Sequence, residues 1–225
     1  MVVVEKEKAI ETIKPIYMAF RDLSTQYLTD TFHIKRIRKS PLLQEWLAMP
    51  YDLSKSEKAE LEKLKDKLDI YGAYYNEGEL KWKFLNPLIR LVDYDEDDAY
   101  DTYIERTIQA EVEGEKLRGT VDFILATGDY EPSGPFFFLH EYKREKGTAD
   151  DPIGQLLSAM LVAQKLNANE NPLYGCYVVG RFWFFVVLTG KKYAITSGHI
   201  ASNDDIFTIY GMLVNMKKII KDKLL

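Results

Sequence analysis

The run Pro135-Phe-Phe-Phe-Leu-His-Glu-Tyr142 constrains the fold of this chain most, because it is aromatic and apolar enough to form a central strand. Side chains two positions apart on a strand point to the same face, so Glu141 and Lys143 share a face. The run 118–127 is typical of a preceding strand. If the two strands are neighbours, Asp122 lies beside Glu141. We therefore expect two carboxylates and an ammonium group to converge.

This combination of charges indicates a particular chemistry. Two carboxylates held close together repel each other unless a cation lies between them, and magnesium typically takes one or two protein carboxylates while keeping waters and substrate phosphates. A lysine beside such an ion can orient or deprotonate an attacking water and can offset charge that builds on a phosphate. The pattern favours phosphodiester hydrolysis. An ion pair within a partly buried sheet accounts for the same residues without any chemistry, and both interpretations stay open at this point.

The order Asp122, then Glu141-Tyr142-Lys143, resembles the active-site signature of the PD-(D/E)XK, or restriction-endonuclease-like, nuclease superfamily. Upstream, Glu77 precedes a Phe-x-x-Pro-Leu segment, which is similar to the helix that opens the nuclease domains of type I restriction motor subunits. Downstream, the run Gly154-Gln-Leu-Leu-Ser-Ala-Met160 resembles the helix that carries a glutamine toward the site, and Gln155 matches that position. The resemblance covers about residues 76 to 188 in family order.

The sequence departs from the family pattern in two places. Val121-Asp122 replaces the Pro-Asp pair of the family name, a change that many members tolerate. Ala159 stands where some relatives carry a tyrosine, four residues after the glutamine. The second departure leaves the subfamily and the substrate open.

The resemblance implies a metal-dependent nuclease that hydrolyses DNA, in restriction, in defence against foreign DNA or in DNA repair. It implies Mg²⁺ or Mn²⁺ held by Asp122, Glu141 and the backbone carbonyl of Tyr142. Glu77 then completes an outer or second ion site or orients a metal-bound water. Lys143 activates or positions the attacking water, and Gln155 anchors Lys143 or a phosphate oxygen. The products implied are a 5′-phosphate and a 3′-hydroxyl, and the enzyme acts as a homodimer or with a partner subunit.

A different class of function fits the same fold: a non-catalytic module that keeps the nuclease architecture and binds nucleic acid or another protein. The net charge of −5 favours this alternative slightly, because it counts against a surface that binds nucleic acid everywhere. An intact set of Asp122, Glu141 and Lys143 argues against it, because holding three charged groups on adjacent strands costs their desolvation.

A local basic stretch is present near the N-terminus, and it consists of Lys35, Arg36, Arg38 and Lys39. These side chains are candidates for contact with nucleic-acid phosphates. They are equally typical of a solvated helix face or helix end. Both interpretations stay open.

The chain is predicted to form an α/β fold with a central mixed sheet flanked by helices, in which residues 1–72 are an N-terminal helical extension and residues 73–225 form the nuclease-like core. The extension is predicted to contain a helix over 5–38, kinked at Pro15, and a second helix that begins with the capping-box pair Ser54 and Glu57. Further strands are predicted over 103–113, 173–179, 182–188 and 193–197, with a helix after Asp151 and another at the C-terminal end.

Composition excludes several classes of protein. A hydrophobic fraction of 46% argues against disorder, and the single Cys176 excludes an internal disulfide and a cysteine metal cluster. His33, His140 and His199 lack zinc-site spacing, and no serine has the context of a nucleophile elbow. No secretory signal and no apolar run long enough for a bilayer is found, so we expect a cytoplasmic protein without a membrane partner.

Overall fold

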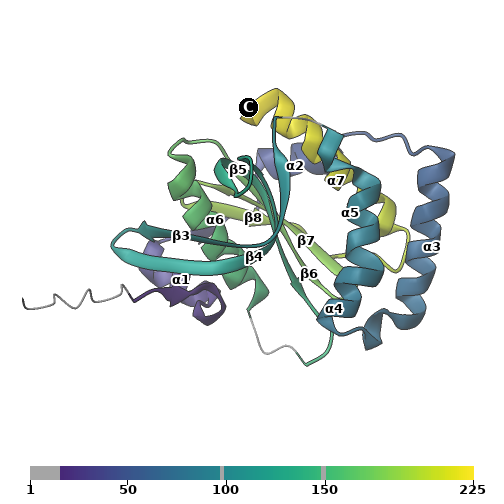
Figure 1. Cartoon of the computed structure of the whole chain (residues 1–225), viewed down its shortest axis with the longest axis horizontal. Helices are drawn as coiled ribbons and strands as arrows, with labels where there is room; N and C mark the ends of the chain where they lie inside the picture. The colour runs from purple at the N-terminus through teal and green to yellow at the C-terminus, as the bar shows by residue number, and fades with distance from the viewer. Residues whose placement is uncertain (1–15, 97–98, 148–150) are drawn as a thin grey trace, which may run out of the picture.

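The computed structural model describes residues 16–96, 99–147 and 151–225, and within them the chain forms a nine-stranded mixed sheet with helices on both faces (Figure 1). The predicted fold class is confirmed. The strand order is β1-β4-β5-β6-β7-β8-β2, with β3 paired to β4 and β9 paired to β7. No helix in these residues is both long enough and apolar enough to cross a membrane.

The strands have the following bounds: β1 (Met18–Ala19), β2 (Lys35–Arg36), β3 (Asp101–Val112), β4 (Glu115–Thr127), β5 (Ser133–Lys143), β6 (Leu173–Val179), β7 (Phe182–Thr189), β8 (Lys192–Ile195) and β9 (His199–Ile200). The helices are α1 (Thr25–Phe32), α2 (Pro41–Ala48), α3 (Lys55–Tyr71), α4 (Glu77–Leu80), α5 (Asn86–Val92), α6 (Pro152–Asn167) and α7 (Asp205–Ile219). A short 3-10 turn, η1 (Phe20–Asp22), follows β1, and a π-helical turn, η3 (Lys81–Leu85), joins α4 to α5.

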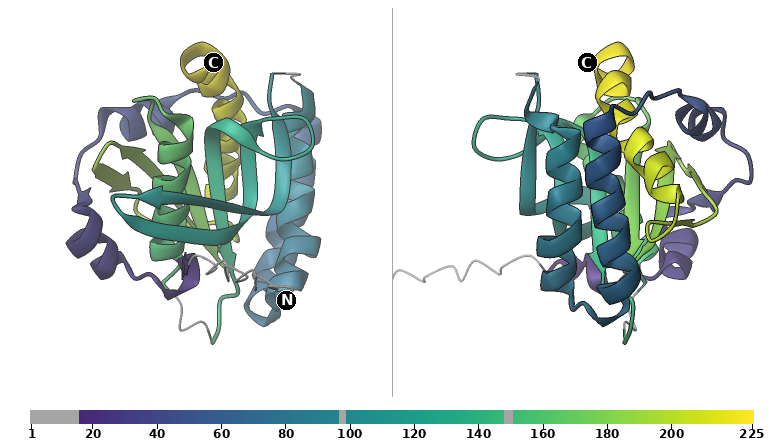
Figure 2. Two further views of the ribbon diagram at one scale, coloured as in Figure 1. Left: turned by 60° about the vertical axis from the view of Figure 1, so that its left-hand side comes forward. Right: turned by 90° about the vertical axis from the view of Figure 1, so that its right-hand side faces the viewer.

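Each face of the sheet has its own hydrophobic core. Helices α1 and α6 cover one face, where apolar side chains of α6 pack against β3, β4 and β5. The other face is covered by α2, α3, α5 and α7, and α3 lies beside α5 at the outer side of the molecule (Figures 1 and 2). Removing these apolar side chains from water is the main force that stabilises the layered arrangement.

The first described segment differs from the predicted single helix over 5–38. Residues 5–15, including Pro15, lie outside the described residues. From residue 16 onward the prediction is wrong, because α1 begins only after Ser24, whose hydroxyl accepts a hydrogen bond from Tyr27 N, and ends at His33 in the left-handed conformation. On either side of α1, short strands pair with the sheet, β1 with β4 and β2 with β8. The stretch 16–72 is therefore not purely helical, and a domain boundary at residue 72 stays a prediction.

The local signals nearer the site are confirmed. Ser54 and Glu57 form the capping box at the start of α3, and Pro152 occupies the first turn of α6 behind the N-cap residue Asp151. The β3–β4 hairpin turns through Glu113 and Gly114, both with positive φ. This hairpin curls over α6 in Figure 2 and carries the acidic residues of the cleft described below.

Candidate functional site

The site lies at a gap in the pairing of β4. One edge of β4 pairs with β5 from Phe123 onward and with β1 at Leu117 and Arg118. The stretch 119–122 lies between these two pairings. Here a cleft of about 640 Å³ opens, lined among others by Gly119, Thr120, Asp122, Glu141, Lys143 and Gln155.

The structure brings Asp122, Glu141 and Lys143 together in this cleft. Pairing of Phe123 with His140 places Asp122 next to Glu141 on the neighbouring strand. Lys143 Nζ lies 2.6 Å from Glu141 Oε1, so these two side chains share a face as predicted. Asp122 Oδ2 accepts a 2.7 Å hydrogen bond from the backbone N–H of Tyr142. All three charged groups are largely withdrawn from solvent, with side-chain exposures of 14% for Asp122, 8% for Glu141 and 14% for Lys143.

The backbone of β4 changes its regular alternation at Asp122. Val121 packs in the core beneath α6, whereas Phe123 packs in the core on the opposite face. Across the hairpin, Glu105 lies between the pairs Ile104–Phe123 and Arg106–Val121 and has a φ of 51°. A left-handed conformation is uncommon for a residue other than glycine and costs on the order of 1–3 kcal/mol. With this irregularity, the side chains of Asp122 and Glu105 both line the cleft.

Lys81, a residue that the sequence patterns did not single out, lies at the centre of the acidic groups. Its ammonium nitrogen is 2.7 Å from Asp122 Oδ1, 3.0 Å from Glu105 Oε1 and 3.1 Å from Glu77 Oε1. Glu77 thus reaches the site, but it does so by pairing with Lys81 one helical turn later. That i,i+4 spacing is the signal through which Lys81 could have been found.

Burial and nearby charges shift the pKa of Glu141 and of Asp122. Burial, together with the charge of Asp122, raises the pKa of Glu141 to about 7, against the opposing effect of Lys143. Burial also raises the pKa of Asp122, and the hydrogen bond from Lys81 opposes this rise. For Lys143, burial alone would lower the pKa, but the adjacent Glu141 raises it overall, so this side chain is an ammonium at neutral pH. Such coupled shifts are typical of functional sites.

The donor set fits a hydrated magnesium or manganese ion in part. Asp122 and Glu141 supply hard carboxylate oxygens from adjacent strands, and the charge of Asp122, which raises the pKa of Glu141, is a repulsion that a cation would relieve. Within the described part of the chain, no group of three or more histidine, cysteine, aspartate or glutamate side chains is arranged to hold a metal ion. Two carboxylates with waters are sufficient for magnesium. Glu77 is engaged by Lys81, and the roles of Glu77 and of the Tyr142 carbonyl as metal ligands stay predictions.

Gln155 reaches the same cleft from α6. Its side chain is 6% exposed, and its Nε2 donor has no hydrogen-bond partner among the described residues. An unsatisfied buried donor costs about 1–3 kcal/mol, so a donor that lines a cleft indicates a position where a bound group would accept a hydrogen bond. Gln155 therefore lies where the sequence predicted it.

The predicted basic residues lie elsewhere. Lys35 and Arg36 form β2, which pairs with β8 at the far end of the strand order from β4, and Arg38 and Lys39 follow directly. All four are exposed, but none of them lines the cleft. The cleft instead has Arg21 and Arg118 on its walls, one from η1 and the other from β4.

Two further residues with reactive side chains, His140 and Cys176, are buried in the protein. His140 lies fully buried on the side of β5 opposite Glu141, with its Nδ1 2.6 Å from the hydroxyl of Tyr142. Burial lowers the pKa of His140 to about 3, so the ring is neutral. Cys176 is a buried residue on β6.

Comparisons with known proteins add little. No family model matches the chain, and no curated protein sequence matches it. Among solved structures, the chain is similar to one described as "cryoEM structure DrdV-DNA complex", with 16% sequence identity and a TM-score of 0.40. The match covers 71% of this chain but only 13% of that chain, so this chain corresponds to a small part of that protein's length. Nothing about the function of this chain follows from a likeness this weak.

Proposed function

We propose that the chain is a metal-dependent nuclease that hydrolyses phosphodiester bonds of DNA in the cleft beside β4 and β5. The observation that carries the proposal is the meeting of Asp122, Glu141 and Lys143 from adjacent strands at one partly buried cleft. The resemblance of the same residues to the PD-(D/E)XK signature supports it, and so does the unpaired donor of Gln155.

In this proposal Asp122 and Glu141 hold Mg²⁺ or Mn²⁺, which supplies Lewis-acid polarisation and a bound water of lowered pKa. Lys143 remains protonated, because Glu141 raises its pKa. It therefore orients the attacking water and offsets charge on the phosphate, and does not remove the proton itself. Gln155 donates to a phosphate oxygen from the opposite wall. A role in restriction, defence or repair, a cytoplasmic location, and action as a homodimer or with a partner subunit belong to the same proposal.

The test is a cleavage assay on single-stranded DNA, duplex DNA and RNA with Mg²⁺. We expect the wild type to cleave at least one DNA substrate, and Asp122→Asn and Lys143→Met each to lower the rate by about 10²-fold or more, the scale of losing one group that stabilises transition-state charge. Lys165→Met, on the exposed end of α6, is the matched control and should cleave like the wild type.

Equal cleavage by all four proteins would contradict catalysis at this cleft, because the activity would then come from another site or from a contaminant. Cleavage of RNA alone would assign a different substrate to the same residues. Cleavage that rises on addition of a second protein subunit would show that the chain is part of a larger enzyme.

One observation favours the non-catalytic alternative. Lys81 already pairs with Asp122, so a positive charge stands beside this carboxylate without a metal ion. A binding module of this kind would hold nucleic acid with equal affinity in EDTA and in Mg²⁺, and would cleave none of the substrates.

A further inference from the structure

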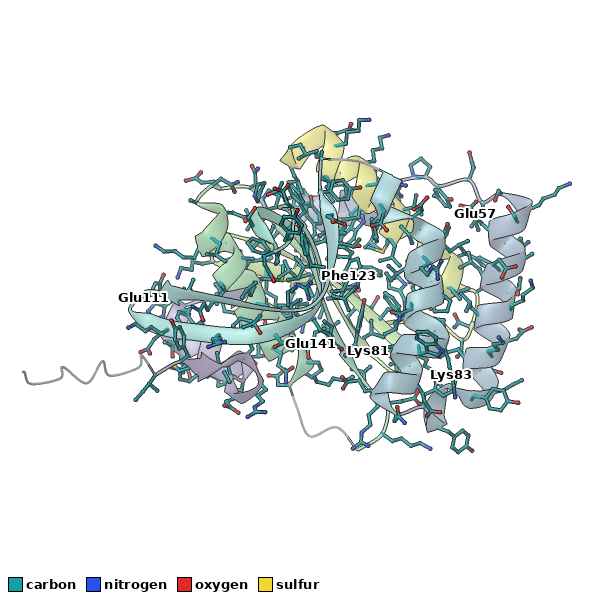
Figure 3. The ribbon with its side chains drawn as sticks, viewed as in Figure 1. Glu57, Lys81, Lys83, Glu111, Phe123 and Glu141 are labelled. Atoms are coloured by element: carbon teal, nitrogen blue, oxygen red, sulfur yellow. The ribbon has the colours of Figure 1, made fainter. Side chains whose placement is uncertain are left out.

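The ammonium group of Lys81 is surrounded by carboxylates that come from separate elements. Glu77 comes from α4, Glu105 from β3 and Asp122 from β4, and all three lie within 3.1 Å of the Lys81 nitrogen. Figure 3 shows Lys81 between α4 and the sheet, near Glu141. Carboxylate oxygens converging from several elements on one positive charge resemble the oxygen shell of a divalent cation, but here the charge that they surround is an ammonium group, and as they stand the three side chains are not arranged to hold a metal ion.

The backbone on both sides is shaped to make this contact. Lys81 begins the π-helical turn η3, an irregularity that is rare in helices and frequent at functional sites. Glu105 approaches from the opposite side in the left-handed conformation described above. A rare helical turn on one side and a costly backbone position on the other therefore meet at one contact, which a surface ion pair would not need.

Lys81 and the proposed metal position lie on either side of Asp122. Asp122 is shared: its Oδ1 faces Lys81, and Glu141 lies on its other side on β5. The charges of Glu77 and Asp122 both act on Glu141 and Lys143, so the two cation positions belong to one electrostatic unit. The Lys81 ammonium is thus a fixed positive charge beside Glu77 and Glu105. Without it, these two carboxylates would have no cation at this position.

We propose that the Lys81 ammonium takes the place of a second divalent ion, so that the cleft holds a single ion between Asp122 and Glu141. This inference rests on the proposed function. It gives Glu77 a positioning role, in which Glu77 and Glu105 hold Lys81 against Asp122, in place of the metal-ligand role that the sequence suggested.

The test is the number of Mn²⁺ ions bound per chain, measured by isothermal titration calorimetry and by electron paramagnetic resonance of free Mn²⁺. We expect one ion for the wild type. Lys81→Met keeps most of the side-chain stem but removes the charge, and we expect it to bind two ions, because Glu77, Glu105 and Asp122 can then all ligate. Lys81→Arg keeps the charge and should bind one.

Lys83→Met is the matched control. Lys83 belongs to the same turn, pairs with Glu79 at 2.6 Å with the same i,i+4 spacing, and lies on the side of the helix away from Glu141 (Figure 3). It should bind one ion, like the wild type. Circular dichroism of each variant establishes that it is folded.

The outcomes separate this inference from the proposed function. Two Mn²⁺ ions bound by the wild type would overturn the role of Lys81 while leaving the nuclease proposal intact, and this result needs no variant. One ion bound by a folded Lys81→Met would also overturn it. No Mn²⁺ bound by the wild type would remove the metal-dependent function itself, and the inference with it.

Discussion

At the scale of the residue, the most informative group is Glu141, a carboxyl whose pKa is raised from 4.5 to about 7 by burial and by the charge of Asp122. The raised pKa means that the folded protein holds a proton that the unfolded chain releases more readily. In the absence of a metal ion, Glu141 therefore contributes almost no penalty below about pH 4.5, and its penalty grows between pH 4.5 and about 7 and is nearly constant above that. The ionised form of Glu141, which a metal ion would need, therefore lowers the stability of the metal-free protein.

We predict that the metal-free protein loses more stability between pH 4.5 and pH 8 than its Glu141→Gln variant does. The shift corresponds to about 3 kcal/mol at most, taking about 1.4 kcal/mol for each pKa unit. Urea unfolding in EDTA at the two pH values measures the difference. Lys143 does not confuse the result, because its raised pKa lies above this pH range.

Glu111→Gln is the control for that measurement, because Glu111 is exposed on β3 away from the cleft (Figure 3). It should follow the wild type at both pH values. If Glu141→Gln follows the wild type as well, Glu141 is not desolvated in solution, and the cleft is more open than the structure shows.

At the scale of the element, signals that are local in the sequence predicted structure well. The capping box of α3 needs only Ser54 and Glu57, three residues apart, and the central strand β5 needs only its run of aromatic residues. The strands β1 and β2 were missed because each has two residues, too few to show a period, and each is defined by a partner strand far away in the sequence. Tertiary pairing, and not local preference, determines those segments.

The capping box gives a prediction at this scale. Ser54→Ala removes the hydroxyl that accepts from Glu57 N, and it should lower the free energy of unfolding by about 1 kcal/mol. Ser56→Ala, two residues further along in the first turn, removes a hydroxyl outside the N-cap position, and it should change stability by less than about 0.5 kcal/mol. Chemical denaturation of the two variants measures the difference. Equal effects would mean that α3 is held by its packing alone.

The same distinction explains how much of the site could be predicted. Asp122, Glu141 and Lys143 were found because strand periodicity fixes which side chains share a face. The position of Lys81 depends on how α4 packs against the β3–β4 hairpin, and that of Glu105 on a left-handed backbone position inside a strand. The i,i+4 spacing could indicate that Lys81 pairs with Glu77, but neither its packing against the hairpin nor the left-handed conformation of Glu105 has a signature in the sequence. The sequence therefore revealed the acid–base pair but not the cation that accompanies it.

At the scale of the whole molecule, the strand order separates two pairs of basic side chains. Arg21 and Arg118 line the cleft beside β4, whereas Lys35 and Arg36 lie on β2 with β5, β6, β7 and β8 between. A nucleic-acid strand whose phosphate meets a metal ion held by Asp122 and Glu141 would lie in the cleft that the first pair lines. The electrostatic part of binding should therefore come from the cleft, although the basic stretch in the sequence suggested the other edge.

We predict that the double variant Arg21→Ala/Arg118→Ala binds DNA more weakly than the wild type, and that the slope of log affinity against log salt falls by about 2, because each arginine neutralises one phosphate. The matched variant Lys35→Ala/Arg36→Ala removes the same charge and should keep the wild-type slope. Fluorescence anisotropy with a labelled DNA in EDTA, over a series of salt concentrations, measures both while preventing cleavage. If the β2 variant shows the larger decrease in slope, the nucleic acid lies across β2 and β8, the prediction for the basic stretch is correct, and the path through the cleft is wrong.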